Sequence, residues 1–332
     1  IKINLEKLKS NVPRDDSFDI TVASEVMAIF CLSNNVKDLE KKIGNITVAY
    51  TKDKKPIYAK DLRAHGPMTV LLKEAIRPNA VQTLENNLAI IHGGPFANIA
   101  HGCNSVVSTK AALKLVDYVV TEAGFGADLG AEKFFDIKCR KSGLEPDAVV
   151  LVATTKALKM HGGIKKEELG SENIDAIIKG CKNLEKHVEN IGKFGVPVVV
   201  AINDYVTDTK KEHAAIIEFC KNIGVDCKIS SHWEKGGIGA VDLAEEVAKI
   251  ADSNSAEFKT LYDDKMSLWD KTQYIAQNIY GAADIIADLK VRNQFKKLED
   301  DGFGEYPICM AKTQYSFSTD PLLMGAPSGH DV

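Results

Sequence analysis

Short apolar runs alternate with helical patterns along most of the chain. The runs 148–153 and 197–202 are almost continuously apolar, which is typical of strands buried on both faces. Between such runs, apolar residues recur three and four positions apart, which predicts helices. The pattern predicts strands over 88–92, 117–121, 148–153, 197–202, 226–230 and 306–311, and helices over 106–116, 131–142, 172–191, 208–223, 240–251 and 273–288. Buried strands that alternate with helices indicate an α/β fold with a doubly wound, mainly parallel sheet.

The first 80 residues have a different pattern. The apolar run 46–50 is followed by Asp53 and Lys54 and then by the apolar pair 57–58, which predicts a β-hairpin. An apolar stripe at helical spacing after Asp19 predicts a helix. A further helix is expected over 61–76, ended by Pro78.

Two glycine-rich runs follow predicted strands: HGGPFANIAHGCNS at 92–105 and EAGFGADLGAEKFF at 122–135. Glycine lets the backbone turn sharply and approach a ligand, and the helix that follows offers free N–H groups to an anion. The second run is not the dinucleotide fingerprint, because three residues separate Gly126 from Gly130 and no suitably placed acid follows. A lone loop of this kind is more often a structural turn than a phosphate cradle. Phe125, an aromatic between two glycines, favours a ligand site, and we expect the two loops to form one site.

Polar side chains in the first run have two interpretations. His92, Asn98 and His101 could contact a ligand, or they could cap neighbouring helices, and for His101 alone the second interpretation is favoured. Ser105 precedes an apolar helical pattern and is predicted to cap it. Cys103 is expected to be a small buried residue rather than a nucleophile, because no partner base is identifiable.

Two aromatic residues follow predicted strands further along the chain. Tyr205 comes after the strand 197–202, and Trp233 comes after the strand 226–230. Open α/β sheets bind ligands at the carboxyl ends of their strands. Two aromatic side chains on adjacent loops can enclose a flat ring between them, and the alternative is that both pack in the core.

Composition narrows the class of protein. The chain has 332 residues, of which 45% are hydrophobic and 27% are charged, as in an ordinary globular protein of about two domains. A net charge of −4 without a basic block argues against nucleic-acid binding. Seven scattered cysteines without a C-x-x-C pair argue against a disulfide framework and a zinc site. No apolar run approaches the ~18–20 residues that cross a bilayer, and we expect a cytoplasmic protein.

Five long motifs resemble the formate–tetrahydrofolate ligase family. They are the two glycine-rich runs, ALKMHGG at 157–163, NIGKFGVPVVVAIN at 190–203 and AKTQYSFS at 311–318. They occur in order across nearly the whole chain. Family members carry a P-loop upstream and further chain downstream, whereas this sequence starts with Ile1 and contains no G-x-x-x-x-G-K-[ST]. The resemblance therefore implies a fragment that lacks the N-terminal P-loop region and the C-terminal end.

The resemblance also implies a fold and a reaction. The sheet would be of the P-loop NTPase type, with the remainder of the nucleotide-binding domain over 1–195 and a smaller, truncated folate-binding α/β domain over 196–332. The reaction would be ATP-dependent ligation of formate to tetrahydrofolate through formyl phosphate, giving 10-formyltetrahydrofolate in one-carbon metabolism. Phe125 and Gly126 would lie on the nucleotide side, and Tyr205 and Trp233 would stack on the pterin of the folate. Relatives often have Phe at the position of Tyr205.

The implied cofactors are ATP and Mg²⁺, with tetrahydrofolate as a substrate and a monovalent cation left open; no metal-ligating residue of this chain is assigned. The implied partners are small molecules (formate, ATP and tetrahydrofolate), with no nucleic acid, no membrane, and a homo-oligomer in the full-length protein. No catalytic residue is assigned, and the chain alone is expected to show no formate-dependent ATP turnover. One alternative is a non-catalytic folate- or nucleotide-binding protein that has lost phosphoryl transfer. A weaker alternative is an α/β NTPase or kinase, against which the missing phosphate-binding lysine motif counts.

Overall fold

Three parallel strands form the central sheet. In the computed structural model, which describes residues 2–3, 13–15, 17–313 and 315–332, β7 (Val149–Ala153), β8 (Val198–Asn203) and β9 (Asp226–Ser230) pair in that order. The register places Leu151 opposite Val200, and Val200 opposite Cys227. Val199 and Val200 are fully buried, as the continuous apolar run predicts. All three strands were expected from the sequence within a residue or two of their ends.

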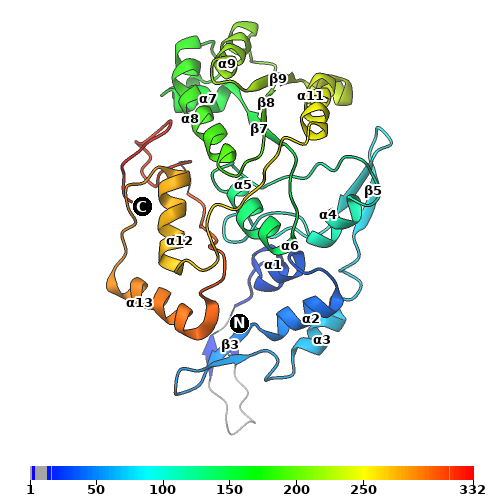
Figure 1. The fold of residues 1–332 in the computed structure, drawn as a ribbon, viewed down its shortest axis with the longest axis vertical. Helices are drawn as coiled ribbons and strands as arrows, with labels where there is room; N and C mark the ends of the chain where they lie inside the picture. The colour runs from blue at the N-terminus through cyan, green and yellow to red at the C-terminus, as the bar shows by residue number, and fades with distance from the viewer. Residues whose placement is uncertain (1, 4–12, 16, 314) are drawn as a thin grey trace.

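Helices lie on both sides of this sheet. The helices α7 (Thr155–His161), α8 (Ile174–Gly192) and α9 (Lys210–Asn222) lie on one side, and α11 (Val241–Asp252) lies on the other (Figure 1). α8 packs against β7 and β8, and α11 packs against β8 and β9. The protein is therefore of the α/β class with a parallel sheet, as predicted. The expected division at residue 195 stays a prediction.

Two predicted strands are wrong, and a third forms outside the central sheet. Among the described residues, neither 117–121 nor 306–311 joins a strand ladder. Val120 is 87% exposed, and the backbone N–H of Ile308 donates to the Tyr262 hydroxyl instead of to a neighbouring strand. The strand expected at 88–92 does form, as β6 (Leu88–Ile91), but it pairs antiparallel with β5 (Asn79–Gln82) in a separate hairpin. An apolar run favours extended backbone, but it does not specify the partner that makes it a strand.

The two helices predicted over 106–116 and 131–142 both form, but their ends differ from the predicted ones. α4 (Val106–Ala112) is shorter than expected, because residues 113–115 continue as turns. The segment 130–142 is one continuous helix made of α5 (Gly130–Lys133), a π-helical turn η2 (Phe134–Cys139) and α6 (Arg140–Ser142). π-helical turns often occur at functional sites.

The helix expected over 273–288 is wrong in its bounds. α12 (Leu268–Ile275) begins earlier, after the N-cap Ser267, whose hydroxyl accepts a hydrogen bond from the backbone N–H of Asp270. The π-helical turn η5 (Ala276–Tyr280) continues it, and Gly281, with φ 74°, ends it in the left-handed conformation. That conformation is the usual stop signal of a helix.

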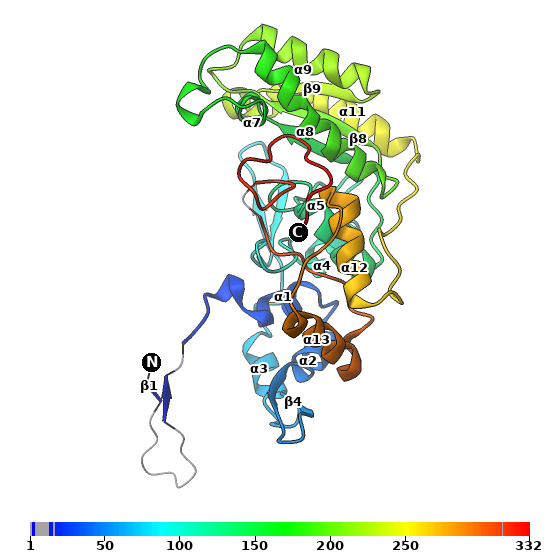
Figure 2. The ribbon, with the colours of Figure 1, turned by 90° about the vertical axis from the view of Figure 1, so that its left-hand side faces the viewer.

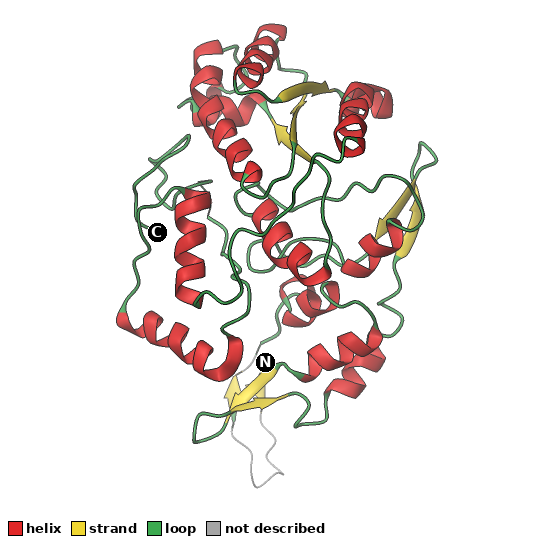
Figure 3. Cartoon of the chain, viewed as in Figure 1, coloured by secondary structure: helices red, strands yellow, loops and turns green. Residues whose placement is uncertain are grey.

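A second helical region lies at the other end of the molecule from the sheet (Figures 1 and 3). Its core contains Phe30, Leu39 and Ile43, and the predicted hairpin of β3 and β4 borders it. The helices α2, α7 and α13 were not predicted. The remaining elements are β1 (Lys2–Ile3), β2 (Arg14–Asp15), η1 (Thr21–Ala23), α1 (Glu25–Cys31), α2 (Val36–Gly44), β3 (Thr47–Tyr50), β4 (Pro56–Tyr58), α3 (His65–Leu71), η3 (Lys166–Glu168), α10 (His232–Lys235), η4 (Gly236–Ala240), α13 (Leu289–Leu298) and η6 (Glu299–Phe303).

The main core joins the sheet to segments that are distant in sequence. Phe135 of η2 lies against Phe194, with ring centres 4.6 Å apart, and Phe317 of the C-terminal segment is buried in the same cluster. That segment runs back beside α8 (Figure 2), where the amide of Asn183 donates to the carbonyl oxygen of Gly325. No helix in the described part of the chain is long and apolar enough to span a membrane.

Candidate functional site

The two glycine-rich loops lie against each other. The ammonium group of Lys133 donates to the carbonyl oxygen of Ala97 at 2.7 Å, and the hydroxyl of Thr121 donates to the Asn104 side chain at 3.0 Å. A Cβ on Gly124 would lie 3.0 Å from the carbonyl oxygen of Gly102, so only glycine fits there without a shift. The structure thus brings the two runs together, as expected from their positions in the sequence.

His92 and His101, the histidines of the first run, are both buried in the protein interior. His92 is buried, with Nδ1 2.5 Å from the hydroxyl of Ser105 and Nε2 2.8 Å from the carbonyl oxygen of Ala75. Ser105 is the predicted N-cap of α4 and accepts from the backbone N–H of Ser108. His101 is buried, and desolvation together with two nearby lysines lowers its pKa to about 4, so it is neutral at pH 7. Both ring nitrogens of His92 are thus engaged within the protein, and His101 is buried.

Cys103 is an inert buried residue. Its side chain is almost completely shielded from solvent, and burial raises the pKa of the thiol to about 12. A thiol in this state is not a nucleophile at neutral pH. All seven cysteines are free, which agrees with the prediction from their spacing.

Two buried lysines under the loops were missed in the sequence. Lys133 and Lys138 are completely buried, and burial lowers the pKa of each ammonium group. Lys138 donates to the side chains of Asn104 (2.5 Å) and Thr109 (3.0 Å). Among the described residues, neither lysine forms an ion pair with a carboxylate. Their charge therefore favours an anion at this junction. The two lysines lie five positions apart in a helix that also carries Glu132, Asp136 and Arg140, so nothing in the local sequence set them apart.

Phe125 projects from its loop toward solvent. Its backbone is left-handed, with φ 70°, and its side chain is 54% exposed. The ammonium group of Lys312 lies 3.9 Å from the centre of the ring, and the backbone N–H of Lys312 donates to the carbonyl oxygen of Asn98. The motif 311–318 therefore meets both glycine-rich runs, although its residue 314 lies outside the described part of the chain.

Gly126 lies close to the side chain of Asp128, two residues later in the turn. A Cβ there would lie 2.5 Å from Oδ1 of Asp128. Asp128 is buried, and desolvation raises the pKa of its carboxyl to about 6, while the charge of Lys312 acts in the opposite direction. The side chain of His187 lies 4.0 Å away, and burial holds its pKa at about 3, so it does not compensate the carboxylate.

Tyr205 and Trp233 lie in the connections that follow adjacent strands, Tyr205 in a loop after β8 and Trp233 in the short helix α10 after β9. β8 and β9 end side by side, with Asn203 opposite Ser230, and the backbone N–H of Asp204 donates to the carbonyl oxygen of Ser230 at 3.1 Å. Tyr205 is 41% exposed and Trp233 is 76% exposed. The alternative in which both rings pack in the core is therefore wrong, and both side chains are free to contact a ligand.

The loop of Tyr205 is held by several hydrogen bonds. The Asn203 amide donates to the Tyr205 hydroxyl at 3.3 Å, and Asp208 accepts from the Tyr205 backbone N–H at 3.1 Å. Thr209 forms a capping box with Glu212 and so fixes the start of α9. The ammonium group of Lys156 lies 4.9 Å from the centre of the Tyr205 ring.

The loop of Trp233 is supported from the β5–β6 hairpin. Gly236 has φ 63°, which allows the turn after α10. The backbone N–H of Gly237 donates to the carboxylate of Glu85 at 2.6 Å. The tip of this hairpin therefore holds the loop that carries Trp233.

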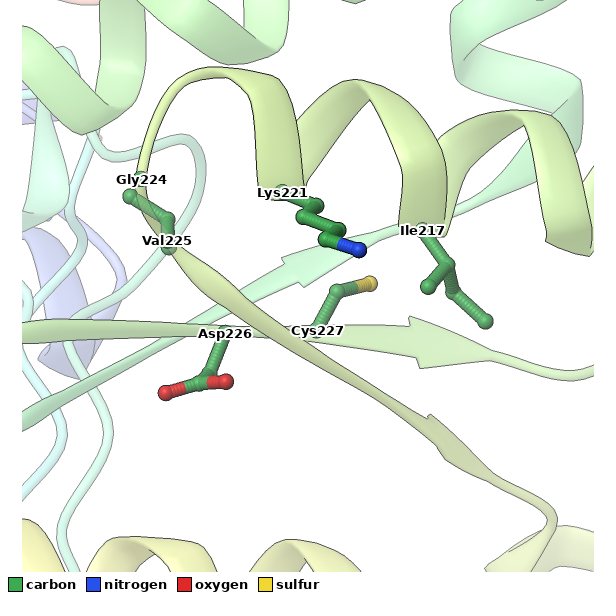
Figure 4. A pocket seen from close by; sticks show the side chains of 6 residues that line it. All are labelled: Ile217, Lys221, Gly224, Val225, Asp226 and Cys227. Atoms are coloured by element: carbon green, nitrogen blue, oxygen red, sulfur yellow. The ribbon is translucent and has the colours of Figure 1, made fainter.

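A pocket at the other edge of the sheet is a different feature. It lies between α9 and the start of β9 (Figure 4) and is lined by Ile217, Lys221, Gly224, Val225, Asp226 and Cys227. This is the amino-terminal end of β9, whereas ligands of parallel sheets bind at the carboxyl ends. We therefore place the candidate site at the loops of Tyr205 and Trp233 and at the glycine-rich junction.

Sequence comparisons match the whole chain to one family of enzymes. The family model of formate–tetrahydrofolate ligase matches residues 1–332. A ligase of that name from Pelagibacter ubique is 64% identical over 332 residues, which is 100% of this chain and 59% of the relative. The corresponding proteins of Granulibacter bethesdensis and Ruegeria pomeroyi are 62% and 59% identical, over 99% and 100% of this chain and 58% and 60% of their own lengths. The chain thus spans about 59% of the length of the curated relatives that it matches.

Proposed function

This chain belongs to the formate–tetrahydrofolate ligase family, and we propose that the full protein joins formate to tetrahydrofolate with conversion of ATP to ADP and phosphate. Within that protein, this chain supplies the folate-binding loops and one wall of the nucleotide site. The product is 10-formyltetrahydrofolate, a carrier in one-carbon metabolism. The resemblance seen in the sequence motifs is confirmed, and the relatives, all named as ligases, do not favour a non-catalytic binding protein.

The proposed chemistry has two transfers. A formate oxygen attacks the γ-phosphorus of ATP, and ADP leaves with the electron pair, which gives formyl phosphate. The N10 amine of the folate then attacks the formyl carbon, phosphate leaves, and the amine loses its proton. Such transfers depend mainly on positioning and on stabilisation of developing charge. Mg²⁺ would accompany ATP and neutralise its phosphates; Phe125 and Gly126 offer it no side-chain ligand.

One observation carries the folate half of the proposal. Tyr205 and Trp233 are two exposed aromatic side chains at the carboxyl ends of neighbouring parallel strands. Exposed aromatic residues cost free energy in water unless they contact a partner, and a flat bicyclic ring such as a pterin suits two of them. The bonds of Asp208 and Glu85 hold the two connections in place.

The nucleotide half rests on the glycine-rich junction. Phe125 offers an exposed ring face, and Gly126 keeps the adjoining backbone open. The buried ammonium groups of Lys133 and Lys138 lie beneath the same loops and favour negatively charged groups near them. We propose that an adenine ring lies against Phe125.

The wider organisation is proposed from family membership. Residues 1–195 would belong to a nucleotide-binding domain of the P-loop NTPase type, and 196–332 to the folate-binding domain. The full protein would be a cytoplasmic homo-oligomer, with a monovalent cation as an optional activator.

Steady-state kinetics of the full-length protein test the assignment of the two halves. Tyr205→Ala and Trp233→Ala should raise KM for tetrahydrofolate and leave KM for ATP and formate unchanged. Phe125→Ala should raise KM for ATP and leave that for the folate unchanged. Tyr50→Ala, an exposed tyrosine on β3 at the other end of the molecule, is the control. Equal effects of the three site variants on all substrates, or no effect on any, would refute the assignment.

A further inference from the structure

Three side chains with metal-ligating atoms converge where β8 leads into α9. Asp204 and Asp208 lie in the connecting loop, and His213 lies in the first turns of α9. Nε2 of His213 is 3.5 Å from Oδ1 of Asp204 and 3.6 Å from Oδ2 of Asp208. One ligand atom from each residue lies within 4.8 Å of the other two. No residue of this chain was expected to bind a metal from its sequence.

One ring nitrogen of the histidine, Nε2, has no hydrogen-bond partner among the described residues. The His213 side chain is only 9% exposed, and its Nε2 is buried without a hydrogen bond. Buried polar atoms are nearly always bonded, so such an atom calls for an explanation. Nε2 faces the two carboxylates, which places a lone pair or a proton of the imidazole in the space between them.

No lysine or arginine among the described residues compensates the two carboxylates. The Asp208 side chain is fully buried and accepts from the hydroxyl of Thr155 (2.6 Å) and from the backbone N–H of Tyr205 (3.1 Å). In the described part of the chain, neither Asp204 nor Asp208 pairs with a lysine or arginine; His213 is the only ion-pair partner of each. The nearby ammonium of Lys156 lies over the Tyr205 ring instead. Two adjacent carboxylates repel each other, and burial makes an unpaired charge costly.

We propose that Asp204, Asp208 and His213 bind one divalent transition-metal ion, with Zn²⁺ as the best match. Two carboxylate oxygens and one imidazole nitrogen suit zinc better than Mg²⁺ or Ca²⁺, which prefer oxygen ligands alone. Ligands about 2.1 Å from a tetrahedral ion are about 3.4 Å apart, close to the two separations seen here. Water would complete the coordination.

The surrounding bonds fit such a centre. The hydroxyl of Thr155 and the backbone N–H of Tyr205 both bond to Asp208 and fix its orientation, as outer partners of metal ligands do. Tyr205 directly follows Asp204 in the sequence, and its backbone N–H donates to Asp208. The ion would therefore hold the loop between β8 and α9 in place.

The test uses the full-length protein after dialysis against a chelator, with neither nucleotide nor folate present. Calorimetric titration with ZnCl₂ should show one site that Asp204→Asn and His213→Gln each weaken at least tenfold. Asp226→Asn, at the opposite edge of the same sheet, is the matched control and should keep the affinity of the unchanged protein. Zn²⁺ should also raise the melting temperature of the unchanged protein and of the control, but not of the two ligand variants.

Two results would overturn the proposal. One is that the unchanged protein binds no Zn²⁺ at this site. The other is that Asp204→Asn binds Zn²⁺ as tightly as the unchanged protein. Asp204 lies in a loop and is partly exposed, so this variant decides the question even if His213→Gln fails to fold. Because the readout is the metal alone, the result does not depend on folate binding.

Discussion

The ammonium group of Lys312 lies 3.9 Å from the centre of the Phe125 ring. This contact joins the C-terminal motif 311–318 to the glycine-rich loop that carries Phe125. The left-handed backbone at Phe125 costs about 1–2 kcal/mol relative to an ordinary conformation, so the surrounding structure has to maintain it. The cation over one face of the ring helps to fix the direction in which the ring points.

Removing this cation should weaken nucleotide binding. We expect Lys312→Met to lower the affinity for a non-hydrolysable ATP analogue by about 0.5–2 kcal/mol, the range of a cation–π contact. Lys312→Arg keeps a cation over the ring and should retain most of the affinity. Calorimetry on the full-length protein measures both. Equal affinities for Lys312→Met and the unchanged protein would show that the contact has no role in the site.

Asp128 should make stability depend on pH. Its pKa is raised from 3.8 to about 6 in the folded protein, so between pH 4 and 6 the folded state holds a proton that the unfolded state has released. The free energy of unfolding therefore falls as pH rises through this window, by about 3 kcal/mol for a shift of this size. Asp128→Asn should remove this loss. The variant should therefore be more stable than the unchanged protein at pH 7, and this difference in the free energy of unfolding should be smaller at pH 4.5. Urea unfolding at the two pH values measures this, and an equal difference at both would contradict the assignment.

Alanine substitutions at two glycines of α8 should have different effects on the free energy of unfolding. A Cβ at Gly180 would overlap the carbonyl oxygen of Leu158 in α7, so Gly180→Ala has to push the two helices apart. We expect a loss of about 1–3 kcal/mol, as for overpacking. Gly192, at the exposed end of the same helix, has no atom within 4 Å of such a Cβ. Gly192→Ala should be neutral or stabilising by up to about 1 kcal/mol. Denaturant unfolding compares them, and similar changes in both would mean that α7 and α8 are less closely packed.

The ion pair of Lys159 and Glu212 should be important for stability. Its atoms are 2.9 Å apart and both side chains are buried, so removing one partner leaves the other charge without compensation. We expect Lys159→Met to lower the free energy of unfolding by about 3–5 kcal/mol. The exposed pair of Lys211 and Glu172, at 3.4 Å, is the matched control, and Lys211→Met should cost less than about 1 kcal/mol. Thermal or urea unfolding with comparable losses for the two variants would contradict the prediction.

The sequence predicted the central sheet well because its middle strand, β8, is a continuous apolar run with a buried interior. The adjacent buried residues Val199 and Val200 break any alternation of apolar and polar positions, which indicates a buried strand. Tyr205 and Trp233 follow the carboxyl ends of β8 and β9, which lie side by side. The segment 117–121 has the same apolar character but finds no partner strand among the described residues, and pairing is a tertiary property. The hairpin of β5 and β6 was missed for the same reason.

The candidate site could be predicted only where glycines or predicted strand ends indicate it. Glycines and an aromatic residue between them pointed to Phe125 and Gly126, and strand ends pointed to the two other rings. Lys133 and Lys138 were missed, because a lysine on a helix is normally exposed and nothing local shows that these are buried. Asp204, Asp208 and His213 were missed as a group, because their spacing matches no common metal motif and only the turn into α9 brings them together.

The central claim is that Tyr205 and Trp233 hold one folate between them. Calorimetry of tetrahydrofolate binding to the full-length protein tests it most directly, with Tyr205→Ala, Trp233→Ala and the control Tyr50→Ala. We predict that each of the first two variants loses about 1–3 kcal/mol of binding free energy, as for a buried aromatic contact, and that the control loses none. Unchanged affinity in both Tyr205→Ala and Trp233→Ala would contradict the account.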